Sequence, residues 1–188
     1  SNSEKRDLLK KLGEFLDKLH NLDSSFVQNL SKVDCHEKYS FIFENVKQEL
    51  SQMLSNSQMK YATELFETYV GKKEYAVPNE SILHGDISLE HVYYVDGHIS
   101  IIDWSDLHIS DPAREFYHLF RSLSEEERKI CMNAYRATDP FFLKRANVYP
   151  LLDTFEVLLI FVKKNQEERI KEFLIRVDQD MIDWKLQS

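Results

Sequence analysis

The sequence predicts a mainly helical protein that carries one small β-hairpin. Apolar residues recur every three or four positions over most of the chain, which is the spacing of amphipathic helices. Between residues 84 and 104 this spacing gives way to two short runs of β-branched and aromatic residues, joined by Asp96-Gly97. That dipeptide is a strong signal for a two-residue hairpin turn. The 188 residues suffice for one hydrophobic core, and because no linker or repeat divides them we expect one compact unit.

Three amphipathic helices are expected before the hairpin, with a long polar connection after the first. They cover roughly residues 4–22, 41–54 and 57–71. Gly71 is a typical residue at the end of a helix. Pro78-Asn79 then interrupts the helical pattern just before the hairpin.

Four helices are expected after the hairpin. They cover roughly residues 112–123, 125–135, 142–163 and 166–177. Asp111-Pro112 is typical of an N-cap followed by proline at the first helical position. Ser124 and Glu127 fit a capping box at the start of the second of these helices. Pro150 predicts a kink in the third.

The composition argues against several classes of partner. With 32 acidic and 24 basic residues the formal net charge is −8, which disfavours nonspecific binding to nucleic acid or anionic membranes. The longest apolar run, residues 157–162, is far shorter than the ~20 residues that span a bilayer, and the first residues do not resemble a signal peptide. Cys35 and Cys131 lack a disulfide or metal spacing, which favours free thiols and a cytoplasmic location. The oligomeric state is not predicted.

The hairpin turn determines which residues face each other. The predicted pairs are Val95 with His98, Tyr94 with Ile99, Tyr93 with Ser100, Val92 with Ile101, and His91 with Ile102. Opposite Cα atoms in antiparallel strands lie roughly 4.5–5.5 Å apart. His91 and Asp103 are therefore expected at the open end of the hairpin, beside the loop that carries Asp86.

A group made of Asp86, His91 and Asp103 suits phosphoryl transfer. One carboxylate can orient a hydroxyl and accept its proton, while a second carboxylate and a neutral ligand hold a divalent cation. Protein kinases place a His-x-Asp pattern, a metal-binding Asn and a later metal-binding Asp in this order. Here His84-Gly85-Asp86 is followed by His91 and then by Asp103.

The segments HGDISLEH, IIDWSD and ISDP, in this order, resemble the aminoglycoside phosphotransferase family, a branch of the protein-kinase-like fold. The helices on both sides resemble the larger, C-terminal lobe of these enzymes. The resemblance therefore covers nearly the whole chain and implies that residues 1–188 form a single C-terminal lobe. Within the family, the sequence around these motifs most resembles the 2″-aminoglycoside and macrolide phosphotransferases.

The resemblance implies a role for each residue of the motifs. Asp86 would be the catalytic base that orients the substrate hydroxyl, and Asp103 would bind the metal. His91 stands where many relatives have a metal-binding Asn, although imidazole is a poorer Mg²⁺ ligand than oxygen. Weak or water-mediated metal binding, a contact with phosphate, and a packed structural histidine all stay open for His91.

Other residues are expected to support the site. The resemblance implies that His84 holds the catalytic loop and that Asp111, the N-cap residue, braces it. Asp106 and Glu115 are candidates for an acidic substrate pocket, with helix-start charge or simple solvation as the alternative. Trp104 is expected in the core. His98, His108 and His118 receive no role.

The resemblance also implies parts that this sequence does not contain. A kinase-like enzyme has a nucleotide-binding lobe with a Gly-rich loop and a Lys on a strand. The four glycines, Gly13, Gly71, Gly85 and Gly97, form no such loop. We therefore expect an isolated C-terminal lobe without its N-terminal nucleotide-binding lobe, inactive by itself, with residues 1–3 as a candidate cleavage remnant.

The expected function of the full-length protein is Mg²⁺-dependent phosphoryl transfer from ATP or GTP to a hydroxyl of a small molecule. A cationic aminoglycoside is the favoured substrate, which would make the protein an antibiotic-resistance kinase. Three alternatives stay open: a macrolide or other amino-alcohol kinase, a non-catalytic kinase-like binding domain, and a metal-dependent phosphohydrolase. The last would use His84, Asp86, His91 and Asp103 as a transition-metal cluster.

Overall fold

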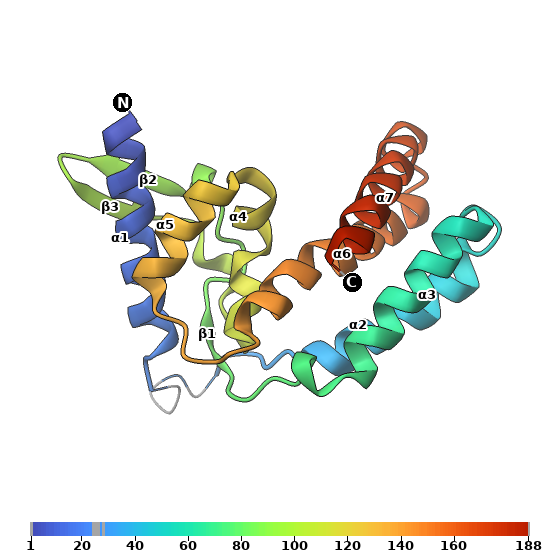
Figure 1. Ribbon diagram of the computed structural model, residues 1–188, viewed down its shortest axis with the longest axis horizontal. Coiled ribbons are helices and arrows are strands. Elements are labelled where there is room, and N and C mark those ends of the chain that lie inside the picture. Colours follow the sequence, from blue (N-terminus) through green and yellow to red (C-terminus); the bar gives the residue numbers. More distant parts are fainter. Residues whose placement is uncertain (1, 24–26, 28, 188) are drawn as a thin grey trace. The chain divides into compact units, whose positions relative to one another are not determined.

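The computed structural model describes residues 2–23, 27 and 29–187 (Figure 1). The chain divides into two compact units, and each is formed from two stretches of sequence. The loop unit comprises Ser1–Asp34 and Val77–Asn147, and the helical unit comprises Cys35–Ala76 and Val148–Ser188. One compact unit was expected from the sequence, because no Gly- or Pro-rich linker marks the division between the two units. At one of the points where the chain passes from one unit to the other, it does so inside a continuous helix, α6 (Phe142–Lys163). This boundary therefore leaves no signal in the composition.

The loop unit combines helices with two small antiparallel sheets. Its elements are α1 (Asn2–His20), β1 (Ser81–Leu83), η4 (Leu89–His91), β2 (Val92–Val95), β3 (His98–Ile101), η5 (Trp104–Asp106), β4 (His108–Ser110), η6 (Pro112–Phe116), α4 (Tyr117–Ser122), α5 (Glu125–Tyr135) and the start of α6. Helix α1 lies along α5 (Figure 1). The two backbones are so close that a Cβ on Gly13 would lie 2.2 Å from the carbonyl oxygen of Cys131.

The predicted hairpin is confirmed, including its register. Strand β2 pairs with β3 in the expected antiparallel register, from Val92 opposite Ile101 to Val95 opposite His98. Asp96 and Gly97 both have positive φ, as a type I′ turn requires. Beyond the strands, the amide of Ile102 donates to the carbonyl of His91 at 3.1 Å, which keeps the predicted pair together.

A second sheet, β1 with β4, was not predicted. Ile82 pairs with Ile109, and each strand has only three residues. Strands this short give little alternation to detect, and their partners are distant in sequence. The pair matters for the site, because β1 leads directly into the loop that carries Asp86.

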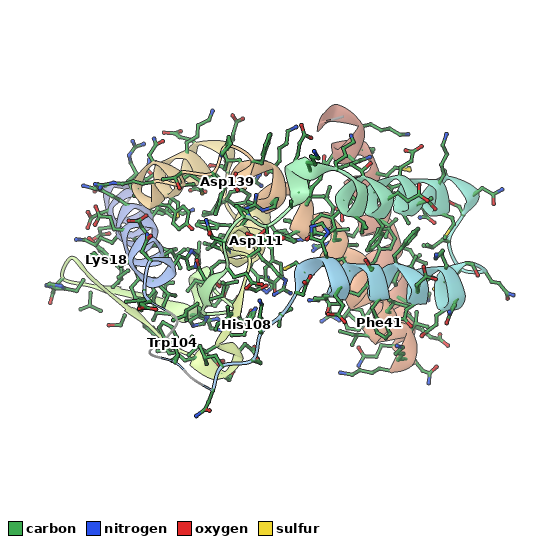
Figure 2. All side chains as sticks on the ribbon, turned by 90° about the horizontal axis from the view of Figure 1, so that it is seen from below. Lys18, Phe41, Trp104, His108, Asp111 and Asp139 are labelled. Carbon is green, nitrogen blue, oxygen red and sulfur yellow. The ribbon has the colours of Figure 1, made fainter. Side chains whose placement is uncertain are left out.

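The helical unit contains α2 (Cys35–Asn45), η2 (Val46–Leu50), α3 (Asn56–Gly71), η3 (Lys73–Tyr75), the rest of α6 and α7 (Glu167–Gln187). Its core includes buried aromatic rings: Tyr39 stacks on Tyr149 with centroids 5.7 Å apart, and the hydroxyls of Tyr69 and Tyr149 lie 3.1 Å apart. The Tyr39 hydroxyl donates to Asp153 at 2.6 Å. Phe41, on the other face of α2, is 69% exposed (Figure 2).

Most predicted helices are present, with shifted ends. The second helix begins at Cys35, inside the expected polar connection, because Cys35, Tyr39 and Ile42 already supply a buried face. The last continues to Gln187, well past the predicted end. The capping box of Ser124 and Glu127 is confirmed, and so is Asp111 as an N-cap, although η6 is a 3₁₀-helix before α4 begins. None of the helices in the described ranges is long and apolar enough to cross a membrane.

Candidate active site

The loop after β1 is held to η6 by one buried carboxylate. Glu115 is 2% exposed, and its Oε2 and Oε1 accept the backbone N–H groups of His84 at 2.6 Å and Gly85 at 3.0 Å. His20 of α1 approaches Oε2 at 3.4 Å through Nε2. Its other ring nitrogen, Nδ1, lies 2.8 Å from the hydroxyl of Tyr135, whose pKa is raised by burial. In the tautomer with the hydrogen on Nε2, which suits the Glu115 carboxylate, Nδ1 accepts from this hydroxyl. Each oxygen of the buried Glu115 carboxylate thus accepts at least one backbone N–H group of the loop.

Gly85 is required at its position in the loop. Its φ is +91°, and a Cβ there would lie 2.2 Å from the carbonyl oxygen of Asp106. The loop and the segment after β3 therefore approach each other closely at this point. Asp106 itself is exposed, and its carbonyl also accepts a hydrogen bond at 2.7 Å from His108, which is labelled in Figure 2.

His84 ties the loop to the end of the hairpin. The ring is buried, and its Nε2 lies 2.9 Å from the carbonyl oxygen of Ile102. A carbonyl only accepts, so Nε2 carries the hydrogen, and Nδ1 can accept the backbone N–H of Asp86 at 3.4 Å. One neutral tautomer satisfies both contacts. His84 thus links the loop to the end of the hairpin, and its supporting role in catalysis stays a prediction.

His91 has a defined tautomer as well. Its Nδ1 lies 2.7 Å from the carbonyl oxygen of Asp86, which makes Nδ1 the donor and leaves the lone pair on Nε2. Metal-binding histidines commonly donate their second ring N–H to a carbonyl in this way. The contact also fixes the backbone of Asp86 against η4.

Asp103 leaves the end of β3 in a left-handed backbone conformation, with φ 64° and ψ 64°. This conformation is uncommon outside glycine, although Asp and Asn tolerate it better than other residues. The carboxylate is exposed, and its Oδ1 accepts the hydroxyl hydrogen of Ser105 at 2.9 Å. Asp103 therefore offers an accessible, oriented carboxylate one residue after the Ile102–His91 pair.

Asp86, the predicted base, has a partner that the sequence analysis did not find. Its side chain is 36% exposed, and Oδ1 lies 3.0 Å from Nε2 of His118 in α4. Oδ2 lies 3.9 Å from Nδ1 of His91. The one available signal was the three-residue spacing between Glu115 and His118, which places both on one helical face.

Of the two residues expected to bind a metal, Asp103 is the one whose donor atoms suit a hard cation. Across the described ranges, no three His, Cys, Asp or Glu side chains come close enough together to hold a metal ion. The four-residue transition-metal cluster that a phosphohydrolase would need is therefore not formed there. The carboxylate of Asp103 suits Mg²⁺, which keeps water and phosphate ligands in nucleotide-dependent enzymes, whereas the imidazole of His91 is the poorer ligand of the two.

Asp111 anchors the start of η6 in the interior. Its Oδ1 accepts the N–H of Ala113 at 3.0 Å, and Oδ2 accepts Nε of Arg145 at 2.7 Å. Arg145 is 1% exposed and also binds Asp139; both aspartates are labelled in Figure 2. The loop amides donate directly to Glu115, whereas Asp111 acts on the loop only indirectly, by fixing the start of the helical segment that carries Glu115.

Two residues lie differently from what the sequence suggested. Glu115 was a candidate for the substrate pocket, but it is buried and bound to loop amides, which favours a structural role. Trp104 was expected in the core, and this was wrong: it is 39% exposed, beside His84 at a centroid distance of 4.7 Å (Figure 2). Its indole N–H donates to the carbonyl of Ile101 at 3.1 Å, so hydrogen bonding at the hairpin end holds the ring in place.

The fold is that of the C-terminal lobe of kinase-like proteins. A family model described as the phosphotransferase enzyme family, APH, matches residues 1–146. The chain belongs to this family. No curated protein matches the sequence significantly.

Solved structures of phosphotransferases share the fold. The GDP complex of wild-type aminoglycoside 2′-phosphotransferase-IIIa has a TM-score of 0.89 and 21% identity, over 97% of this chain and 64% of that one. The GDP and kanamycin complex of APH(2″)-IIIa gives 0.87 and 21%, over 95% and 63%. Macrolide 2′-phosphotransferase type I gives 0.74 and 15%, over 90% and 58%. The chain thus spans less than two thirds of the length of these relatives.

Proposed function

We propose that the full-length protein transfers a phosphoryl group from ATP or GTP to a hydroxyl of a small molecule, and that this chain supplies its substrate-side lobe. The observation that carries the proposal is the placement of Asp86. Its accessible carboxylate stands on a loop fixed by Glu115 and His84, next to the hairpin end that bears His91 and Asp103. A carboxylate so placed can orient an acceptor hydroxyl and take its proton.

Asp103 and His91 are the residues that would hold Mg²⁺, which neutralises charge on the transferred phosphoryl group when bound. Asp103 offers an exposed carboxylate, and His91 offers the lone pair of Nε2. The nucleotide-binding part would come from a further lobe, in keeping with the share of the relatives' length that this chain spans.

An aminoglycoside is the favoured acceptor. Two similar structures are named as aminoglycoside phosphotransferases, one of them with kanamycin bound, and the net charge of −8 favours a cationic substrate. GDP in both complexes supports testing GTP beside ATP as the donor. A macrolide is the second candidate, because the macrolide phosphotransferase shares this fold.

The test is an acceptor screen with the full-length protein, using ³¹P NMR to detect phosphorylated product. Aminoglycosides, macrolides and simple amino-alcohols are each offered with Mg²⁺ and either ATP or GTP. The proposal expects product from one class and none from the Asp86→Ala variant. A wild-type rate in Asp86→Ala would show that Asp86 is not the catalytic base. If the wild-type protein phosphorylates none of the acceptors, the result would favour a non-catalytic binding domain.

A second measurement addresses the cation. The Mg²⁺ concentration needed for half-maximal rate should rise at least about tenfold in Asp103→Asn, because a neutral amide binds the ion more weakly than a carboxylate. Asp96→Asn, at an exposed aspartate in the hairpin turn, is the matched control and should behave as wild type. An unchanged Mg²⁺ requirement in Asp103→Asn would exclude Asp103 as a ligand.

A further inference from the structure

We propose that His118 is a positioning residue, which fixes the side chain of Asp86 so that one carboxylate oxygen faces the acceptor hydroxyl. The inference rests on the proposed role of Asp86. Its direct observation is the distance of 3.0 Å between Nε2 of His118 and Oδ1 of Asp86. Oδ1 can only accept a hydrogen, so Nε2–H is the donor.

His118 and Glu115 hold consecutive parts of the same loop. The two residues lie three positions apart on the continuous helical segment of η6 and α4, and therefore on one face. Glu115 binds the backbone N–H groups of His84 and Gly85. His118 lies beside the side chain of the next residue in the loop, Asp86.

The helix that carries His118 is firmly anchored. Leu119 and Phe120, the next two residues of α4, are 0% and 4% exposed. The ring of Tyr117 lies against that of His118, with centroids 3.7 Å apart. His118 is itself 38% exposed, so it can reach a half-exposed carboxylate without being buried.

The two histidines beside Asp86 contact different parts of it: His91 contacts its backbone carbonyl and His118 its side chain. His91 donates Nδ1–H to the Asp86 carbonyl, so it fixes the backbone. The terminal torsion of an aspartate is broad and poorly defined by itself. A donor on Oδ1 restricts that torsion and directs Oδ2 toward the acceptor, which is the kind of orientation that raises the rate without strengthening substrate binding.

The test compares two substitutions of His118 in the full-length protein. His118→Leu removes the donor, while the amide N–H of His118→Gln can replace Nε2–H. We expect kcat to fall about tenfold in His118→Leu with KM within about twofold, and to recover to at least about one third of wild type in His118→Gln. His98→Gln, an exposed histidine on the hairpin, is the matched control and should leave both constants unchanged.

Wild-type kcat in His118→Leu, or an equal loss in both His118 variants, would overturn the inference. The Asp86→Asn variant distinguishes failure of this inference from failure of the proposed function. If Asp86→Asn loses activity while His118→Leu keeps the wild-type kcat, the inference about His118 fails but the proposed function of the protein stands. A second readout does not need turnover. In ¹⁵N-histidine NMR spectra the Nε2–H resonance of His118 should move in Asp86→Asn, and an unmoved resonance would contradict the contact.

Discussion

The loop unit and the helical unit stabilise their interiors by different means. The loop unit buries charged and polar groups, including His84, Asp111, Glu115 and Arg145, and pairs them across segments that are distant in sequence. The helical unit relies more on packed aromatic rings around Tyr39 and Tyr149, although it also buries Asp153, Thr154 and Asp180. Buried ion pairs add little net stability but are costly to break. The loop unit therefore depends on specific partners, and those partners hold the loop with Asp86.

The largest loss of stability is expected from Arg145→Met. It leaves the carboxylate of Asp111, 1% exposed, without its ion-pair partner. Breaking such a buried pair costs about 3–5 kcal/mol of unfolding free energy, measured by urea denaturation. Arg169→Met is the matched control, because the exposed pair with Glu172 contributes at most about 1 kcal/mol. Equal losses in the two variants would contradict a special dependence on Asp111.

The same substitution should have opposite effects in the two units. Gly13→Ala puts a methyl group 2.2 Å from the backbone oxygen of Cys131 and should cost about 3 kcal/mol. Gly71→Ala in the helical unit meets nothing within 4 Å and should gain roughly 0.4–1 kcal/mol by restricting the unfolded chain. Unfolding free energies from denaturant titration compare the two. A neutral Gly13→Ala would show that α1 and α5 are less tightly packed.

A smaller loss is expected when a polar contact is removed from the helical unit. Tyr39→Phe deletes the donor to the Asp153 carboxylate, a hydrogen bond of 2.6 Å, and should cost about 1.5–2 kcal/mol. Tyr93→Phe, on the exposed side of the hairpin, is the control and should change stability by less than about 0.5 kcal/mol. Hydrogen exchange should show the added opening in α2 and α6. Added opening confined to the loop unit would contradict this assignment.

The smallest expected effect concerns the Cys131 thiol, which should not react with an alkylating reagent in the native protein. Burial raises the pKa of the Cys131 thiol to about 12, so almost none is in the reactive thiolate form at pH 8. Iodoacetamide should therefore modify Cys131 only after unfolding, as followed by mass spectrometry of the peptide. Rapid modification of the native protein would show that α5 opens from α1.

Local signals predicted the hairpin and its register, because Asp96-Gly97 defines both the turn and the pairing. The same register brought His91 and Asp103 together from the sequence alone. Non-local contacts could not be predicted in this way. His118, the partner of Asp86, lies on α4 and comes next to the loop only through the tertiary packing of that helix. Strand β1 likewise pairs with β4, and the whole hairpin lies between them in the sequence. The prediction that Trp104 lies in the core was wrong because it rested only on the large apolar side chain. The indole N–H instead binds the carbonyl of Ile101 and holds the ring at the end of the hairpin.

The most direct measurement of the central claim is single-turnover phosphoryl transfer by the full-length protein with Asp86→Asn and, as a control, Asp96→Asn in the exposed hairpin turn. Both substitutions replace one aspartate of the loop unit with a neutral residue of the same shape. Rapid quenching separates the chemical step from product release. If Asp86 accepts the proton of the acceptor hydroxyl, the rate constant falls roughly 10²–10⁴-fold in Asp86→Asn and stays at the wild-type value in Asp96→Asn. A wild-type rate constant in Asp86→Asn would contradict the account.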